Sequence, residues 1–344
     1  MTEWRSNNVL ESAEFIAGHC ECITIDEEAI DKSAIWLAGQ HESGAFSLKR
    51  WRAENPLHHQ DQSDDCLQWV FLVDSLNFCF WSAEPSGELF TVAHGGKLYT
   101  GYWSLCAAIN RALEEGVPLL DAGFLRDISL ECVQHVFRSA TDTQVPLLEE
   151  RRRVLQQMGA GLEEHFGGHF KHLVEAAQGS AERLVALVAG HFPSFADTAA
   201  YQGRTVYLYK RAQILVADVW AAFEGESHGR FDDIDQITMF ADYRVPQVLA
   251  HLGILRYSDP LLAVLRSGEL LPSGSPTEVE IRACSIWSVE LLRRKLVQLL
   301  QPILSSSSSV VNAITIDFYL WDYAKDHADL MNEIPIHRTR SIYY

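Results

Sequence analysis

A helical repeat of apolar residues runs through most of this chain and constrains its fold more than any other feature. From Tyr102 onward, apolar side chains recur three and four positions apart, the spacing that places them on one face of an α-helix. The repeat is clear in SLCAAINRALEEG, SAERLVALVAGHF, YKRAQILVADVWAAFEG, VEIRACSIWSVELLRRKLVQLL and NAITIDFYLWDYAKDHADL. Asp26 predicts the start of an earlier helix in EEAIDKSAIWLAG. We therefore predict a mainly α protein.

A smaller part of the sequence predicts β structure. The stretch QWVFLVDSLNFCFWS is rich in aromatic and β-branched residues, as strands are. His94-Gly95-Gly96 separates two alternating segments and predicts a hairpin turn. We expect one small antiparallel β region at roughly residues 69–100. No linker composition interrupts the chain, so we predict one compact domain over 1–344, with a β-containing part at about 50–105 and a helical part at about 106–344.

Charge and cysteine content narrow the functions that fit. The formal net charge is −18, which disfavours intact nucleic acid and an anionic membrane surface as partners. The seven cysteines are scattered without a C-x-x-C pair, so neither a zinc site nor a disulfide framework is expected. His58 and His59 precede several aspartates, but a polar loop explains them better than a metal site. We expect neither a metal nor a cofactor. No apolar leader or membrane-spanning run is visible, so we expect a cytoplasmic protein.

The strongest candidate for chemistry is the segment MFADYR. Asp242 follows Phe240, precedes Tyr243, and stands just before a helix start that has Pro246 in its first turn. A carboxylate beside aromatic walls is partly desolvated and acts strongly on a cation opposite it. A purely structural pairing of this aspartate with Arg244 is an equally open interpretation.

Two further segments carry candidate site residues. In DFYLWDY, Asp317 and Trp321 are four positions apart and share a helix face, with Asp322 next to it. Such an acidic, aromatic wall suits a planar cationic ligand, although a solvated acidic face with core rings is the simpler explanation. In YKRAQ, Lys210 and Arg211 begin a predicted helix, where a phosphate is favoured. Ordinary surface charge explains this pair as well.

These segments together resemble a known family. WVFLVDSLNFCFWS, YTGYWSLCAAINRALEEG, YKRAQILVADVW, ITMFADYRVPQVLAHLGIL, FYLWDYAKDH and IPIHRTRSIYY are similar to the queuosine salvage proteins, which are queuosine 5′-phosphate N-glycosylase/hydrolases. The similarity extends from about Trp51 to Tyr344. It implies a helical architecture like that of helix-hairpin-helix DNA glycosylases. It also implies hydrolysis of the N-glycosidic bond of queuosine 5′-phosphate, with release of queuine for reuse in tRNA modification.

The same resemblance implies roles for individual residues. The catalytic aspartate of the family's F-A-D-Y-R block matches Asp242, with Phe240 beside the base. The D-x-x-L-W-D block matches Asp317, Trp321 and Asp322. A substrate-contacting histidine of some relatives is replaced here by Asn55, and a takeover of its contact by His58 or His59 is the open alternative. From residue type and position alone, Lys210 and Arg211 are expected at the 5′-phosphate. A non-catalytic protein that binds queuine or queuosine is the main alternative.

Overall fold

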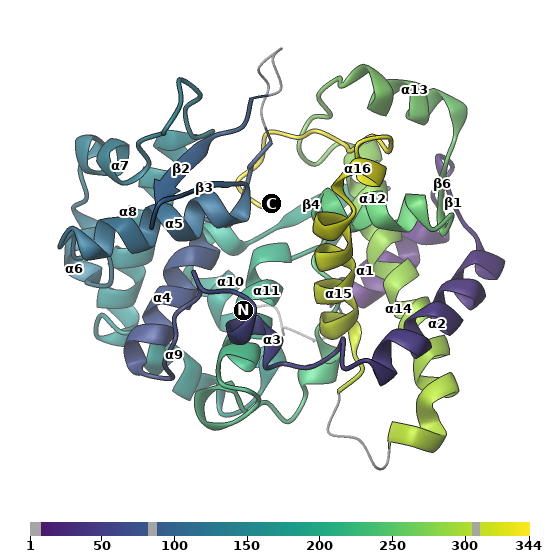
Figure 1. The fold of residues 1–344 in the computed structure, drawn as a ribbon, viewed down its shortest axis with the longest axis horizontal. Helices are drawn as coiled ribbons and strands as arrows, with labels where there is room; N and C mark the ends of the chain where they lie inside the picture. The colour runs from purple at the N-terminus through teal and green to yellow at the C-terminus, as the bar shows by residue number, and fades with distance from the viewer. Residues whose placement is uncertain (1–7, 82–87, 305–309) are drawn as a thin grey trace. The chain divides into compact units, whose positions relative to one another are not determined.

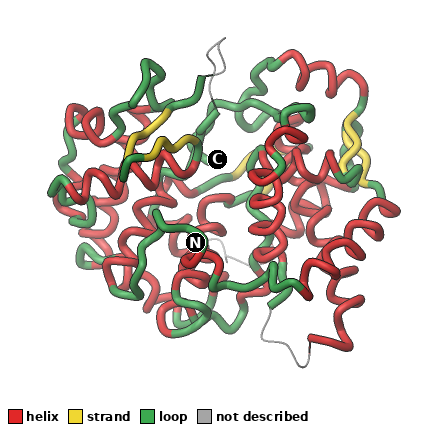
Figure 2. Tube along the Cα trace, viewed as in Figure 1, coloured by secondary structure: helices red, strands yellow, loops and turns green. Residues whose placement is uncertain are grey.

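The computed structural model describes residues 8–81, 88–304 and 310–344, and helices make up most of them (Figures 1 and 2). The α-helices are α1 Asn8–Ala17, α2 Glu27–Glu42, α3 Arg50–Ala53, α4 Asp64–Ser75, α5 Tyr102–Glu114, α6 Ala122–Arg126, α7 Leu130–Val136, α8 Leu148–Phe166, α9 Phe170–Ala177, α10 Ala181–His191, α11 Lys210–Ala222, α12 Arg244–His251, α13 Asp259–Ser267, α14 Pro276–Leu304, α15 Ala313–Asp326 and α16 Ala328–Met331. Short 3-10 turns are η1 Pro193–Phe195, η2 Ser227–Gly229 and η3 Ile234–Gln236. The mainly α prediction is confirmed.

Strands are few and short within the described residues. They form three antiparallel two-stranded sheets. The pairs are β1 Ile23–Ile25 with β6 Leu255–Tyr257, β2 Thr91–His94 with β3 Lys97–Thr100, and β4 Thr198–Tyr201 with β5 Arg204–Tyr207. The predicted hairpin turn is confirmed, because Gly95 and Gly96 both have positive φ between β2 and β3. Only one of the three sheets was therefore expected.

The strand prediction for the stretch that begins at Gln68 is wrong. Residues up to Ser75 belong to α4, in which every residue from Cys66 to Ser75 is buried. A helix buried on all sides has no polar stripe, so its apolar run cannot be told from a strand by periodicity. The missed signal is Ser63, whose side chain accepts the Cys66 N–H at the helix start.

The described residues form two compact units, and each is treated by itself. The first contains the described parts of 1–48, 197–213 and 233–340. Its centre is the long helix α14, which packs against α1, α2, α12 and α15. The first half of α14 is buried on several sides, as Val279, Ile286 and Val289 show. This unit carries most of the candidate site residues.

The second unit contains 214–232, 341–344 and the described parts of 49–196. Helix α8 packs against α4, α6, α7 and α9. A ring cluster fills the space between these helices, with Phe71 stacked on Phe170 at 4.4 Å between ring centroids. The prediction of one domain over the whole chain stays a prediction.

Candidate active site

The segment from Thr238 to Tyr243 enters helix α12 without regular secondary structure, so its peptide groups are held by side chains. The Gln213 Oε1 accepts both the N–H and the hydroxyl of Thr238, each at 3.0 Å. Next along the segment, the Phe240 N–H donates to Asp317 Oδ2 at 2.9 Å. Met239, Phe240 and Ala241 are buried. Buried peptide groups need such partners, and these contacts therefore fix the segment.

Asp242 is the residue at which this segment meets α12. Its Oδ1 accepts the backbone N–H of Arg244 at 2.7 Å and that of Val245 at 3.1 Å. The carboxylate lies one residue before the N-cap Tyr243 and accepts the first two N–H groups of the helix, where the aligned peptide dipoles favour negative charge. The sequence prediction of a helix start directly after Asp242 is confirmed.

The second carboxylate oxygen of Asp242 is not used by the start of α12. Within the described residues, Oδ2 accepts no hydrogen bond, and the residue is half-buried. No ion pair joins Asp242 and Arg244 in this part of the chain; the Arg244 guanidinium donates instead to Gln247 Oε1 at 2.9 Å. One oxygen is therefore held by the helix, while the other can still accept a hydrogen bond. A purely structural pairing would instead bind the Asp242 carboxylate to the Arg244 guanidinium.

Asp317 is buried in α15 and differs in environment from Asp242. Burial raises the pKa of its carboxyl well above the usual range, and the charge of Asp242 adds to the effect. The Phe240 N–H and Lys210 act in the opposite direction on that pKa. Two neighbouring carboxyls with different environments are a common basis for dividing acid and base roles.

Trp321 and Lys325 follow Asp317 at intervals of four residues on α15. The Lys325 ammonium lies 4.9 Å from the centroid of the Trp321 ring. Part of the Lys325 side chain is exposed, yet desolvation by the surrounding protein lowers its pKa to about 8, helped by Arg244 and opposed by Asp242. The structure thus adds Lys325 to the candidate site. Its spacing from Asp317 and Trp321 was a signal in the sequence that was missed.

Lys210 and Arg211 lie at the start of α11, as the sequence predicted. Both are buried, which excludes ordinary surface charge as their explanation. The Lys210 N–H donates to Asp197 Oδ2 at 3.1 Å. Because Lys210 acts on the pKa of Asp317, the structure places this cation near the acidic pair. Their role toward a phosphate stays a prediction.

Tyr243 and Asp322 are both half-buried in the same unit. The Arg244 guanidinium lies 5.4 Å from the centroid of the Tyr243 ring. The contacts of the two residues with a substrate stay predictions.

Asn55 belongs to the second unit. Its amide donates to the carbonyl of Trp51 at 3.0 Å, close to the end of α3. The buried His58 bonds the same carbonyl through Nδ1 and the Tyr102 hydroxyl through Nε2. Burial lowers the pKa of His58 to about 4, so a neutral ring is favoured. The proposed substrate contact of Asn55 stays a prediction.

The arrangement in the first unit defines a class of site. Two carboxyls in contrasting environments, with aromatic rings and lysines nearby, are suited to breaking a glycosidic bond in an anionic substrate. No set of three or more His, Cys, Asp or Glu side chains in the described part of the chain is placed to hold a metal. None of the helices described is long and apolar enough to span a membrane.

Comparison with known proteins gives the family. The model of the queuosine salvage protein family matches residues 57–344. A queuosine 5′-phosphate N-glycosylase/hydrolase from Mus musculus is 46% identical over 335 residues, which cover 97% of this chain and 98% of the relative. Enzymes of the same name from Schizosaccharomyces pombe and Sphaerobacter thermophilus are 43% and 41% identical, each over 98% of this chain and over 100% and 97% of their own lengths. The chain belongs to the queuosine salvage protein family.

Proposed function

We propose that this protein hydrolyses the N-glycosidic bond of queuosine 5′-phosphate and releases queuine for salvage. Family membership and 41–46% identity to three enzymes of that name, over nearly the whole chain, support the activity. The structural observation that carries the proposal is the Asp242 carboxylate, whose Oδ1 is fixed by the start of α12 and whose Oδ2 accepts no hydrogen bond within the described residues.

Asp242 acts on the sugar. As the bond from C1′ to the base breaks, its electron pair leaves with the base nitrogen and positive charge develops on the ribosyl ring. A fixed carboxylate beneath C1′ stabilises this charge, and it either attacks C1′ directly or orients the water that does. Water finally supplies the hydroxyl at C1′, and its other proton balances the base, so the products are queuine and ribose 5-phosphate.

Asp317 acts on the leaving base. Queuine is a 7-deazaguanine and has carbon at the position where a purine is protonated at N7, so acid assistance must reach another edge of the ring. The raised pKa of Asp317 favours its protonated form, which donates a hydrogen bond to the developing negative charge. Asp322 then pairs with the secondary ammonium on the cyclopentenediol arm. Phe240 and Trp321 stack on the base.

The remaining predicted residues bind the other parts of the substrate. Lys210 and Arg211, which are both buried, bind the 5′-phosphate. Tyr243 contributes a further substrate contact in the first unit, and a contact of Asn55 with the substrate is proposed from the family resemblance alone. The family resemblance also supports a helix-hairpin-helix glycosylase-like architecture, a single domain over 1–344 and a cytoplasmic location. Neither intact nucleic acid nor a membrane is a partner in this proposal.

The test is direct incubation with queuosine 5′-phosphate, followed by mass spectrometry for free queuine and ribose 5-phosphate. Asp242→Asn keeps an acceptor for the α12 N–H groups but loses the charge, so turnover falls at least about 100-fold. Asp329→Asn, at an exposed position of α16, is the matched control and keeps wild-type turnover. A stoichiometric complex without product would instead identify a queuosine-binding protein, and near-normal turnover of Asp242→Asn would remove the carboxylate from the mechanism.

A further inference from the structure

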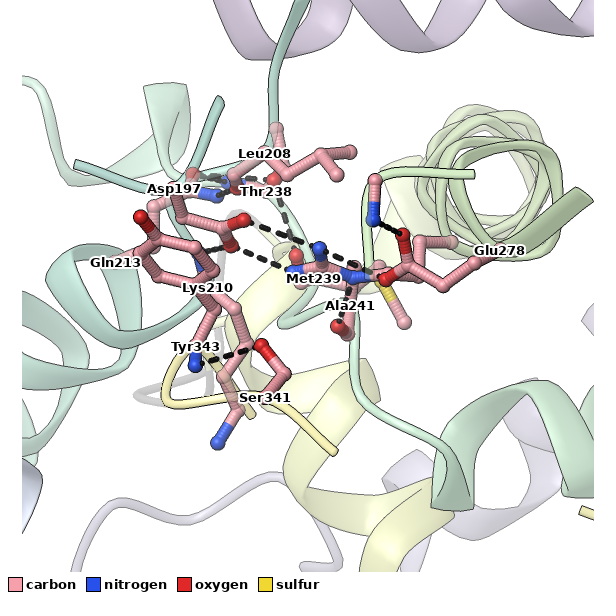
Figure 3. A network of polar contacts seen from close by, with 12 residues as sticks. Asp197, Leu208, Lys210, Gln213, Thr238, Met239, Ala241, Glu278, Ser341 and Tyr343 are labelled. Atoms are coloured by element: carbon pink, nitrogen blue, oxygen red, sulfur yellow. Dashed lines mark hydrogen bonds and ion pairs between the residues drawn. The ribbon is translucent and has the colours of Figure 1, made fainter. Parts of the chain in front are cut away.

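In the first unit, a network of buried ion pairs contacts the segment that carries Asp242. Its centre is Arg282 of α14, whose side chain is 2% exposed. The guanidinium donates to Asp197 Oδ1 and Oδ2 at 3.0 and 2.5 Å, and to Glu278 Oε1 at 3.3 Å. Asp197, Glu278 and Ala241 are parts of one polar network (Figure 3).

Arg282 also reaches the backbone next to Asp242. Its Nε–H donates to the Ala241 carbonyl at 2.9 Å. That carbonyl belongs to the same planar peptide unit as the Asp242 N–H, which donates to the Phe240 carbonyl at 2.7 Å. The peptide unit is therefore held at both ends. The orientation of this peptide unit sets the position of the Asp242 Cα. It therefore also sets which carboxylate oxygen accepts the N–H groups at the start of α12.

The guanidinium cannot turn within this network. Asp197 is itself fixed because its Oδ2 accepts the Lys210 N–H, and Glu278 is fixed because its Oε2 accepts the Gly274 N–H at 3.0 Å. Only the planar fork of arginine offers donors in these several directions at once. Burying three charges costs desolvation energy that an apolar cluster would avoid. We therefore expect the network to fix the geometry of the segment more than to stabilise the fold.

We infer that Arg282 is a positioning residue for catalysis, which sets the Asp242 carboxylate by holding the Ala241 carbonyl. The inference rests on the proposed function and extends it to a residue that does not touch the substrate. Misplacing a catalytic group by about 1 Å is sufficient to reduce a rate about 100-fold. The sensitive quantity is therefore kcat, whereas substrate affinity depends on other side chains.

The experiment measures kcat and KM of the full-length protein with queuosine 5′-phosphate. Arg282→Ala is expected to lower kcat about 10- to 100-fold with a much smaller change in KM. Guanidinium ion at a sub-denaturing concentration restores part of the kcat of Arg282→Ala by occupying the vacated site. Arg282→Lys keeps the charge but loses the fork, and its kcat also falls, without rescue by guanidinium. Arg293→Ala, on the same helix and paired with Glu290, is the matched control and keeps wild-type kcat.

Asp197→Asn provides a second variant in case Arg282→Ala does not fold. The amide keeps one acceptor for Arg282 and loses the other, so kcat falls in the same direction but less. A lowered melting temperature with unchanged kcat per folded molecule would overturn the inference and leave Arg282 a structural residue. Absence of queuine release by the wild-type protein is a separate result: it would refute the proposed function, and the inference with it.

Discussion

Two irregular segments of this protein are each held by one buried arginine, but they differ in what is buried with it. In the first unit, Arg282 holds the Ala241 carbonyl beside Asp242 and is neutralised by Asp197 and Glu278. In the second unit, Arg151 of α8 holds the segment from Leu76 to Cys79. Both arginines replace regular secondary structure as the partner of buried carbonyl groups.

Arg151 has no carboxylate partner among the described residues. It donates to the carbonyls of Leu76 at 2.7 Å, Phe78 at 2.6 Å and Pro146 at 3.0 Å, and its guanidinium lies 4.4 Å from the Phe78 ring centroid. Burial lowers its pKa to about 10. The segment that it holds carries buried apolar side chains and no half-exposed acid. A buried arginine that binds backbone carbonyls thus supports packing in one unit and a candidate catalytic carboxylate in the other.

The largest expected effect comes from replacing Arg151, and it distinguishes a role in stability from a role in catalysis. Arg151→Met should lower the free energy of unfolding by about 3–5 kcal/mol, because four carbonyls lose a donor at about 1–3 kcal/mol each while a desolvation cost disappears. The kcat of the folded fraction should not change. Urea unfolding followed by circular dichroism, together with the queuine-release assay, measures both. The exposed Arg153→Met is the control.

The comparison breaks if the Arg151 variant loses turnover while it remains folded. That result would connect the second unit's segment to the chemistry. It would also remove the contrast with Arg282, since both arginines would then affect kcat.

The long amphipathic helices were predictable because they carry local signals, whereas the fully buried α4 was not. Asp26 caps α2 through the Ala29 N–H at 2.8 Å, and Asn312 and Thr315 form a reciprocal capping box at the start of α15. The β1–β6 pair joins residues about 230 positions apart, for example Ile23 and Tyr257, and no local pattern reports such a pairing. The hairpin of β4 and β5 did have a local signal in Gln202-Gly203, which both have positive φ, and it was missed.

The candidate site was predictable only in part, for the same reason. The segment around Asp242 and the α15 residues stand out by residue type and spacing. Arg282 and Asp197 do not, since Arg282 looks like any charge on a long helix until the fold buries it beside the Ala241 carbonyl. Positioning contacts are made across the fold, and a single sequence does not record them.

The second prediction concerns pH sensitivity in the second unit. His58 has a folded pKa of about 4 against 6.5 in the unfolded chain, so the folded state binds fewer protons between these values. Its contribution to stability is present above pH 6.5 and is lost as the pH falls toward 4. The shift corresponds to about 3 kcal/mol at most. In His58→Gln, the decline in melting temperature from pH 7 to pH 4.5 should be shallower than in the wild type.

His59→Gln is the matched control for this measurement, because His59 is the adjacent, half-buried histidine. Loss of the bonds to Trp51 and Tyr102 lowers the stability of His58→Gln at every pH, so the slope is the informative quantity. An unchanged slope would mean that His58 does not limit acid stability.

The smallest expected effect has the opposite sign and belongs to the first unit. The pKa of Asp317 is raised by burial and by Asp242. Its carboxyl therefore contributes stability that is present below its unfolded pKa and is lost as the pH rises through the folded value. Asp317→Asn keeps an acceptor for the Phe240 N–H and removes the titration. As the pH rises above the pKa of the unfolded carboxyl, the variant's melting temperature should fall less than that of the wild type, at about 2–4 °C for each kcal/mol.

Measurements above pH 7 avoid the acid-sensitive groups of the same unit, and Lys325, whose pKa is about 8, titrates there in the wild type and the variant alike. Burial and Arg282 lower the pKa of His337 to about 3, so above pH 7 that ring is neutral in both the folded and the unfolded chain. Asp322→Asn, at a half-buried carboxyl of α15, controls for removal of an acid from the helix. Equal slopes for wild type and Asp317→Asn would mean that Asp317 is ionised in the folded protein. A proton-bearing Asp317 could then no longer assist the leaving base, whereas the role of Asp242 at the sugar would stand.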